Sequence, residues 1–311
     1  MNAKQTSKNI IVGLSGCTKL VDLIAQRTKI KKAKILISHF ADGESFIKIC
    51  ESVKDKHVYV IQSTCPPVNE NLMELLITID ILKRSSAKLI TVICPYYGYA
   101  RQDRLLSKNE SLTAKLVTNL LEKSGTDNIY LLDPHSSQIQ GFFNIPNEII
   151  SGIHFLINEI KKSNDLKDFV IVSPDYGSVK RIKNLSETYK IPMLIINKNR
   201  PQPNVVEIVD ILGTTDIKNK NCLIIDDMID TGGTIITACK TLKKMGCKKI
   251  IVGCIHGVLS MDSVEKFNLA YKDKIIDQLF ISNSIDSIYT KKIKNLHIVD
   301  ISSYLTKNIF N

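Results

Sequence analysis

The sequence predicts an α/β fold in which two similar domains each form a mostly parallel sheet flanked by helices. Short β-branched runs alternate with amphipathic stretches of helical length along the chain, which is typical of helix-covered parallel sheets. A length of 311 residues with 44% hydrophobic residues is enough for two domains of ordinary size. We place the domains at 1–150 and 151–311, and we expect the last residues to pack back on the first domain.

In the first half of the chain the expected strands are IIVGL (10–14), AKILIS (33–38), VYVIQ (58–62), LITVIC (89–94) and IYLLD (129–133). The second half repeats this rhythm with FVIVS (169–173), MLIIN (193–197), CLIID (222–226), IIVGC (250–254) and LHIVD (296–300). The helical period is clearest in one apolar stripe, which consists of Leu72, Leu75, Leu76, Ile79 and Leu82 and ends at Lys83 and Arg84. We interpret this stripe as core.

Composition and charge exclude several classes of function. The net charge of +11 is spread along the chain, and no basic stretch is interleaved with stacking aromatics. We therefore expect no nucleic-acid partner and attribute the charge to a small polyanionic ligand or to solubility. No apolar run approaches the roughly 18 residues of a membrane span, and the N-terminal run is interpreted as a strand. The eight cysteines form no CxxC pair, which favours buried thiols and a cytoplasmic location.

Two segments of the chain resemble each other and suggest an ancient duplication. Residues 56–94 and 220–254 each run from lysine through a buried strand, a polar loop and a helix with a basic end to a second strand that ends in cysteine. Any two βαβ units share such a pattern, so the loops are the informative part. The first loop, QSTCPPVNEN, contains two prolines that cannot donate a backbone N–H group. We therefore expect no phosphate site in the first copy.

The loop of the second copy combines acidic residues with a glycine-rich helix start. Its residues are Asp226, Asp227 and Asp230, followed directly by Thr231, Gly232, Gly233 and Thr234. A helix that begins near the second threonine leaves backbone N–H groups unpaired at the positive end of its dipole, where they can bind a phosphate. The glycines allow close approach to the backbone, and the threonines can add hydroxyl donors.

The aspartates of this loop predict the other end of the ligand. Strand geometry places Asp226 and Asp227 on opposite faces, so one points into the ligand space while the other orients its surroundings. Carboxylates accept hydrogen bonds from sugar hydroxyls, and a sugar ring would separate them from the anion. Ribose 5-phosphate has that shape. The alternative, that the aspartates cap the helix and bind water, is weaker because three of them precede Thr-Gly-Gly-Thr.

This loop resembles the phosphoribosyl-pyrophosphate (PRPP) motif shared by type I phosphoribosyltransferases and ribose-phosphate pyrophosphokinases. The segments that favour the second family are FADGES (40–45), CPYYGYARQDR (94–104), DPHSSQIQGFF (133–143) and SPDYGSVKR (173–181). The chain is therefore similar to the ribose-phosphate pyrophosphokinase family, class I-like, over nearly its whole length. The resemblance implies that both domains are of the phosphoribosyltransferase type.

The resemblance also implies substrates, a cofactor and site residues. The substrates are ATP and ribose 5-phosphate, the cofactor is Mg²⁺, and the assembly is a homo-oligomer, typically a hexamer. The matching residues are Arg101, Gln102 and Asp103 for ATP; Phe40, Asp42 and Glu44 for the ATP of a neighbouring subunit; His135 and Asp175 for the metal; Lys198 and Arg200 for catalysis; and Asp226, Asp227, Asp230 and 231–234 for ribose 5-phosphate. The residue types suit these roles, since Arg binds phosphate bidentately and paired cations offset developing charge.

Some of these assignments have plainer alternatives. The RQDR segment alone would be a solvated charged loop, His135 a structural hydrogen-bonding residue, and INKNRPQPN (196–204) a surface turn. The chain departs from the family at Asn109, Ser111, Tyr176 and Ser178 and loosens a Gly-Asp pattern at 213–215, so the family's response to phosphate and ADP is not predicted for it. The role of Asp230 also stays open.

The implied reaction transfers the β,γ-pyrophosphoryl group of MgATP to the C1 hydroxyl of ribose 5-phosphate, which gives PRPP and AMP for nucleotide biosynthesis. One rival is a phosphoribosyltransferase that consumes PRPP. A second rival is a non-catalytic subunit of the family, which the matching catalytic and metal residues argue against. A third, nucleic-acid binding, rests on the net charge alone.

Overall fold

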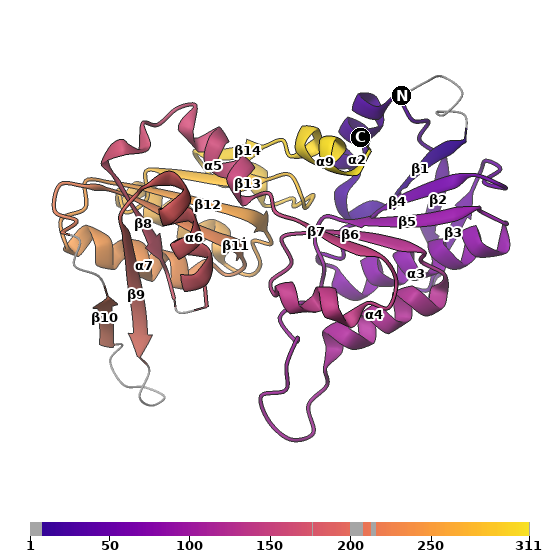
Figure 1. Ribbon diagram of the computed structural model, residues 1–311, viewed down its shortest axis with the longest axis horizontal. Helices are drawn as coiled ribbons and strands as arrows, with labels where there is room; N and C mark the ends of the chain where they lie inside the picture. Colours follow the sequence, from indigo (N-terminus) through magenta and orange to yellow (C-terminus); the bar gives the residue numbers. More distant parts are fainter. Residues whose placement is uncertain (1–7, 176, 200–207, 213–215, 311) are drawn as a thin grey trace. The chain divides into compact units, whose positions relative to one another are not determined.

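The computed structural model describes residues 8–175, 177–199, 208–212 and 216–310, with only the backbone at 197–199 and 208–212 (Figure 1). The chain divides into two compact units. The first unit comprises Met1–Gly152, Asn283–Asp286 and Asp300–Asn311. The second unit comprises Ile153–Ser282 and Ser287–Val299. Each unit has its own sheet and its own hydrophobic core.

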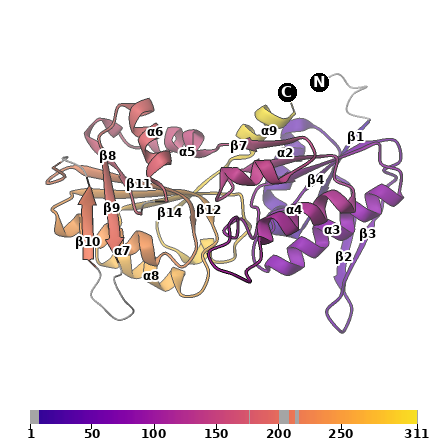
Figure 2. The same cartoon turned by 60° about the horizontal axis from the view of Figure 1, so that its bottom comes forward.

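The first unit contains a five-stranded parallel sheet of order β1-β4-β5-β6-β7. Its strands are β1 (Asn9–Gly13), β4 (His57–Ile61), β5 (Leu89–Cys94), β6 (Asn128–Leu132) and β7 (Asn147–Ile150). Its helices are α2 (Thr18–Thr28), α3 (Val68–Arg84), α4 (Thr113–Ser124) and α9 (Ser302–Ile309), with 3-10 turns η1 (Ser15–Cys17) and η2 (Ser137–Phe142). Figures 1 and 2 show α3 and α4 on one face of the sheet and α2 and α9 on the other.

One expected strand of the first unit lies outside this sheet. The AKILIS run forms β2 (Ile35–His39), which pairs only with β3 (Ser45–Ile49) in an antiparallel two-stranded sheet. The reason is the short FADGES connection, because a tight turn returns the chain beside the strand it has just left. Gly43, at φ 94°, makes that turn, and its N–H donates to the carbonyl of Phe40 at 2.9 Å. The AKILIS run is therefore an antiparallel exception within the mostly parallel fold that the sequence predicted.

The second unit contains a seven-stranded sheet of order β10-β9-β8-β11-β12-β13-β14, parallel except where β10 joins β9. Its strands are β8 (Phe169–Ser173), β9 (Met193–Asn199), β10 (Ile208–Leu212), β11 (Asn221–Ile229), β12 (Lys249–Gly257), β13 (Gln278–Ser282) and β14 (Leu296–Val299). Its helices are α5 (Ile153–Lys161), α6 (Val179–Tyr189), α7 (Gly233–Lys244) and α8 (Ser263–Lys272), with 3-10 turns η3 (Leu166–Asp168) and η4 (Thr290–Lys292). Figure 2 shows α5 and α6 on one face and α7 and α8 on the other.

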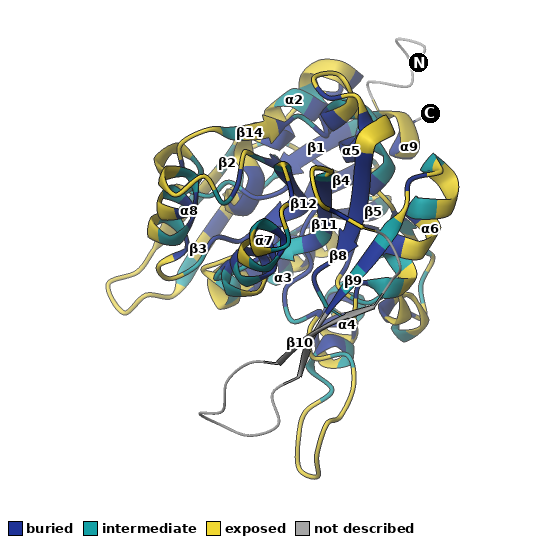
Figure 3. Ribbon diagram, turned by 90° about the vertical axis from the view of Figure 1, so that its left-hand side faces the viewer, coloured by how far each residue is buried: buried dark blue, intermediate teal, exposed yellow. Residues whose placement is uncertain are grey.

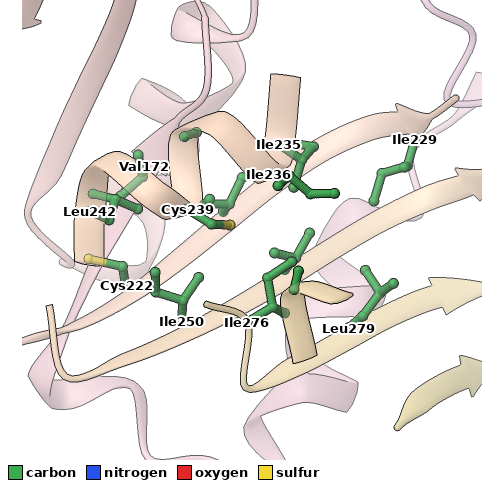
Figure 4. Packing of buried hydrophobic residues seen from close by; sticks show 14 of the residues in the cluster. Val172, Cys222, Ile229, Ile235, Ile236, Cys239, Leu242, Ile250, Ile276 and Leu279 are labelled. Carbon is green, nitrogen blue, oxygen red and sulfur yellow. The ribbon is translucent and has the colours of Figure 1, made fainter. Parts of the chain in front are cut away.

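The central strands of both sheets are buried on both faces, as parallel sheets require. Figure 3 shows β5 and β8 buried along nearly their whole length. In the first unit the predicted stripe of α3 faces the core, with Leu75, Ile79 and Leu82 fully buried. In the second unit Cys239 and Leu242 of α7 pack onto the sheet, as Figure 4 shows. These apolar contacts fix each helix, and therefore each strand-to-helix turn, against its sheet.

The last helix packs within the first unit. The guanidinium of Arg27 in α2 donates to the hydroxyl of Ser302 at 2.7 Å and pairs with Asp300 at 2.9 Å. The rings of Tyr59 and Phe310 lie 4.6 Å apart between centroids. A chain segment that follows the second unit therefore completes the outer layer of the first.

The cysteines all lie in the described parts of the chain and all are free thiols, with Cys50 exposed and the others buried. Burial raises the pKa of Cys94 to about 12, so this thiol stays protonated. Across the described residues, no helix combines the length and the apolar character needed to span a membrane.

Candidate active site

The site begins where β11 ends at the edge of the second unit's sheet. The expected strand CLIID stopped at Asp226, whereas β11 continues to Ile229. Asp226 and Asp227 therefore lie inside the strand, and Asp230 is the first residue after it. Since β8 and β12 run parallel on either side, the polar groups lie at the carboxyl ends of three neighbouring strands. Ligands of open α/β sheets bind at that edge.

The turn into α7 depends on a glycine with a left-handed backbone. Gly232, at φ 75°, precedes the first residue of α7. A Cβ atom at this position would lie 2.7 Å from Cε2 of Phe267, a fully buried residue of α8. At Gly233, in contrast, a Cβ atom would meet only Thr231 Oγ1, at an ordinary 3.8 Å. Only the first glycine is therefore required by the fold.

The start of α7 presents backbone donors without a side-chain cap. Gly232 is the N-cap residue, and no side-chain hydrogen bond caps this end among the described residues. Thr231 and Gly233 are half-buried and Thr234 is exposed, so the first turn borders solvent. With no acidic residue in the first turn, the positive end of the helix dipole is left for an external anion.

Asp226 and Asp227 converge on a single cation, although alternation along the strand predicted opposite directions. Nη1 of Arg181, in the first turn of α6, lies 2.9 Å from Oδ1 of Asp226 and 3.0 Å from Oδ1 of Asp227. The hydroxyl of Ser178 donates to the same Asp226 Oδ1 at 3.1 Å. The side chains of Arg181, Asp226 and Asp227 are 24%, 15% and 5% exposed. The long arginine reaches both carboxylates from the neighbouring helix.

Arg181 belongs to the SPDYGSVKR segment, but no role was predicted for it. The signal that could have found it is topological: Arg181 follows β8, and β8 is the strand next to β11. Asp226 and Asp227 come some 45 positions later along the chain, at separations of 45 and 46. Only the sheet order brings them together.

The electrostatics of Asp226 follow from this crowding. Burial, and next the charge of Asp227, raise the pKa of Asp226 to about 7, while Arg181 opposes the shift. Two carboxylates that share one cation in a partly buried place resist full ionisation. The pair thus carries a negative charge that responds to pH near neutrality.

Asp230 and Asp175 are each held by a neighbouring loop. Oδ1 of Asp230 accepts a short hydrogen bond from the hydroxyl of Ser260. Oδ1 of Asp175 accepts the backbone N–H of Ser178 at 3.0 Å, and the hydroxyl of Ser173 donates to the Asp175 carbonyl at 2.7 Å. The structure therefore joins Asp175 to the Asp226 pair through one residue, Ser178, which hydrogen-bonds both.

The two expected metal residues belong to different units. His135 is an exposed residue just after β6 in the first unit, and Asp175 follows β8 in the second. Among the described residues, no group of three or more His, Cys, Asp or Glu side chains is arranged to hold a metal ion. Mg²⁺ prefers oxygen ligands and keeps several waters, so one oriented carboxylate beside a phosphate site fits this ion without a protein cage.

The expected ATP residues line a cavity in the first unit. This cavity has a volume of about 300 Å³ and is lined by Val68, Asn69, Tyr96, Gly98, Tyr99, Ala100, Arg101 and Gln102. Oε1 of Gln102 accepts a 2.6 Å hydrogen bond from the hydroxyl of Thr113, at the start of α4. Arg101 is exposed, and Asp103 is half-buried and not among the lining residues. The cavity therefore brings together two of the three expected side chains.

The FADGES segment forms the β2–β3 turn and is not part of that cavity's lining. The Phe40 side chain is 56% exposed, and its ring meets Phe46 edge-on at 5.9 Å. Oδ1 of Asp42 accepts the N–H of Glu44 at 3.1 Å. The turn is thus an ordered, exposed projection of the first unit.

Most of the remaining expected residues lie wholly or partly outside the described part of the chain. Lys198 pairs with Val209 in the backbone of β9 and β10, and its side chain lies outside the described residues. Arg200, Tyr176 and the 213–215 segment also lie outside them. Asn109 and Ser111 are exposed residues of the loop that precedes α4.

Paired carboxylates at a strand end, followed by an uncapped helix start, are typical of the phosphoribosyltransferase class of α/β domain. Residues 142–282 match the family model described as the phosphoribosyl transferase domain. Residues 9–125 match the model of the N-terminal domain of ribose phosphate pyrophosphokinase. The chain belongs to the ribose-phosphate pyrophosphokinase family, and the fold class predicted from the sequence is confirmed.

Individual relatives match over nearly the whole chain. A ribose-phosphate pyrophosphokinase of Mycoplasma genitalium is 48% identical over 296 residues, covering 95% of this chain and 89% of its own length. The enzyme of that name from Bacillus subtilis is 42% identical over 310 residues, covering 99% and 96%. The crystal structure of phosphoribosylpyrophosphate synthetase from Mycobacterium smegmatis matches with a TM-score of 0.90 at 34% identity, covering 97% and 98%.

Proposed function

We propose that the chain transfers the β,γ-pyrophosphoryl group of ATP to the C1 hydroxyl of ribose 5-phosphate, giving PRPP and AMP. The observation that carries this proposal is the β11–α7 turn, where paired carboxylates precede an uncapped helix start. The relatives named ribose-phosphate pyrophosphokinase support the choice of this reaction over the consumption of PRPP. The product would supply nucleotide biosynthesis in the cytoplasm, and no nucleic-acid or membrane partner is needed.

In this proposal the second unit binds ribose 5-phosphate. The 5-phosphate is held by the backbone N–H groups of residues 231–234 and by the hydroxyls of Thr231 and Thr234. Asp226 and Asp227 accept hydrogen bonds from the ribose hydroxyls, at the distance that the sugar ring sets. Asp230, fixed by Ser260, borders the same ligand.

The first unit binds ATP. Arg101, Gln102 and Asp103 hold the nucleotide at the cavity beside α4. Phe40, Asp42 and Glu44 complete the nucleotide site of a neighbouring subunit, so the working assembly is a homo-oligomer, by resemblance a hexamer. The exposure of Phe40 suits a residue that is covered only on assembly.

His135 and Asp175 would hold Mg²⁺, which when bound neutralises phosphate charge on ATP. Lys198 and Arg200 stabilise the charge that develops on the transferred group. The C1 oxygen forms a bond to the β-phosphorus, the bond from that phosphorus to the α,β-bridging oxygen breaks with its electron pair going to AMP, and the hydroxyl proton passes to solvent. No protein nucleophile is required, so catalysis consists of positioning and charge stabilisation.

The test is product analysis of the purified chain with MgATP, ribose 5-phosphate and inorganic phosphate. We expect AMP and PRPP in equal amounts by ion-exchange chromatography and ³¹P NMR. AMP should not form without ribose 5-phosphate. Failure to form AMP, together with release of pyrophosphate from added PRPP and a nucleobase, would instead identify a phosphoribosyltransferase.

A further inference from the structure

The start of α6 contacts the strand-end carboxylates through two side chains. Ser178 is the N-cap residue of α6, and Arg181 lies one turn further along. We propose that Ser178 and Arg181 are positioning residues that set the affinity for ribose 5-phosphate by orienting Asp226 and Asp227. This inference rests on the proposed function, because it assigns the two carboxylates to the ribose hydroxyls.

The hydrogen bonds to Asp226 orient its carboxylate. The Ser178 hydroxyl, Nη1 of Arg181 and the backbone N–H of Asp227 all donate to Oδ1, at 3.1, 2.9 and 3.0 Å. Three donors on Oδ1 fix the plane of the carboxylate and therefore the position of Oδ2. Oδ2 is then the acceptor that a sugar hydroxyl meets without prior reorientation of the side chain.

Arg181 also offsets the negative charges of Asp226 and Asp227. Asp226 and Asp227 are adjacent in a strand and only 15% and 5% exposed, so their ionised forms repel each other with little help from solvent. Nη1 of Arg181 lies within 3.0 Å of a carboxylate oxygen of each. Removing the guanidinium leaves two poorly solvated carboxylates, which respond by binding a proton or by turning apart. Either response removes an acceptor from the ribose site.

Ser178 makes a second, smaller contribution to the orientation of the Asp226 carboxylate. Its side chain is buried, and its backbone N–H donates to Asp175 while its hydroxyl donates to Asp226. Replacing the hydroxyl with hydrogen removes one orienting bond without altering the net charge.

The experiment compares four variants of the full-length chain. Arg181→Met removes the guanidinium, Arg181→Lys keeps a charge, and Ser178→Ala removes the hydroxyl. Lys180→Met is the matched control, because Lys180 is an exposed neighbour in the same turn and its loss changes the net charge by the same amount. Steady-state kinetics give KM for each substrate and kcat, and isothermal titration calorimetry gives the Kd of ribose 5-phosphate.

We expect Arg181→Met to raise KM and Kd for ribose 5-phosphate by about 30-fold, since a poorly solvated charge pair is broken. Arg181→Lys should recover part of that loss, because a point charge lacks the planar geometry of the guanidinium. Ser178→Ala should raise both constants by about fivefold, the value of one hydrogen bond. KM for ATP and kcat should stay within about threefold of the wild type, and Lys180→Met should match the wild type.

If Arg181→Met folds, either of two results overturns the inference. In the first, its Kd for ribose 5-phosphate equals that of Lys180→Met. In the second, KM for ATP and kcat worsen in parallel with KM for ribose 5-phosphate, which indicates a general structural role. If Arg181→Met does not fold by circular dichroism, Ser178→Ala decides, and an unchanged Kd overturns the inference. Calorimetry also separates the two proposals. If the wild type forms no AMP but Arg181→Met still binds ribose 5-phosphate more weakly than the wild type, the proposed reaction is refuted and the positioning role is supported.

Discussion

The β4–α3–β5 segment of the first unit and the β11–α7–β12 segment of the second have the same architecture but differ in the turn that leads from the first strand into the helix. In each, two parallel strands pair directly and one helix connects them. The first turn runs through Pro66 and Pro67, which remove two backbone donors. The second runs through Gly232 and Gly233 and keeps its donors. The same βαβ unit therefore presents different backbone chemistry according to its turn.

The first turn satisfies its polar groups internally. Gln62 accepts the N–H of Gly16 at 2.9 Å and donates to Glu74 at 3.1 Å, and Glu74 accepts the hydroxyl of Ser15 at 2.7 Å. Gln62 and Glu74 are 0% and 1% exposed. A hydrogen-bonded network of this kind rigidifies the part of the turn that contains Gln62.

The second turn leaves backbone donors uncapped at a helix start that borders solvent. Its carboxylates are paired with Arg181 from another element, and its helix start has no side-chain cap among the described residues. Substitutions in the first turn should therefore change stability, whereas substitutions in the second should change substrate binding or turnover. Four predictions test this contrast.

The largest expected effect concerns the catalytic role that we propose for Lys198. Lys198→Ala should lower kcat by about 100-fold or more with a small change in KM for ribose 5-phosphate, because the interaction belongs to the transition state. Lys240→Ala, which removes an exposed cation from α7, is the control and should leave kcat unchanged. Steady-state kinetics measure both, and an unchanged kcat in Lys198→Ala would remove this residue from the mechanism.

The second prediction separates the two glycines of the β11–α7 turn. Gly232→Ala should lower the free energy of unfolding by about 3 kcal/mol, because the φ of 75° is strained for alanine and its Cβ atom overlaps Phe267. Gly233→Ala has room for its Cβ atom and should change stability by less than about 1 kcal/mol. Urea denaturation followed by circular dichroism measures both. Equal losses in the two variants would contradict the geometry.

The third prediction tests the internal network of the first turn. Gln62→Ala should lower the free energy of unfolding by about 2 kcal/mol, since it leaves buried partners unsatisfied. KM for ribose 5-phosphate should stay at the wild-type value. Met73→Ala, on the exposed side of α3, is the control and should cost less than about 0.5 kcal/mol. A raised KM without loss of stability in Gln62→Ala would give the first turn a binding role.

The smallest expected effect is a pH dependence of ribose 5-phosphate binding. Burial and the charge of Asp227 raise the pKa of Asp226 to about 7, with Arg181 and Asp175 as the other charged groups that act on it. Above that pKa the carboxylate is ionised and accepts hydrogen bonds; below it the acceptor is lost. KM should therefore fall by about tenfold between pH 6 and pH 8. Asp226→Asn should retain only the titration of the substrate's own phosphate, and an identical profile would exclude Asp226 as the titrating group.

Local patterns were enough to predict much of the fold. The LITVIC and FVIVS runs coincide with β5 and β8, because continuous β-branched runs can be buried only in a covered sheet. The apolar stripe of α3 and the glycine-rich start of α7 were equally local. The strands that were not placed are β3, β7, β10 and β13. The first three lie at sheet edges, where pairing with one neighbouring strand, rather than a continuous apolar run, marks the strand.

The sequence by itself determined the chemistry that this protein can offer: a glycine that tolerates a left-handed turn, donors at a helix start and carboxylates just before them. Those properties depend on residues close together in the chain. The tertiary structure alone decided how the carboxylates are held, because Arg181 reaches them only after β8 and β11 have become neighbours. The packing of the last residues on the first domain was an expectation, and the structure supplies its contacts: α9 lies within the first unit, since a helix that buries one face packs against the apolar surface available to it.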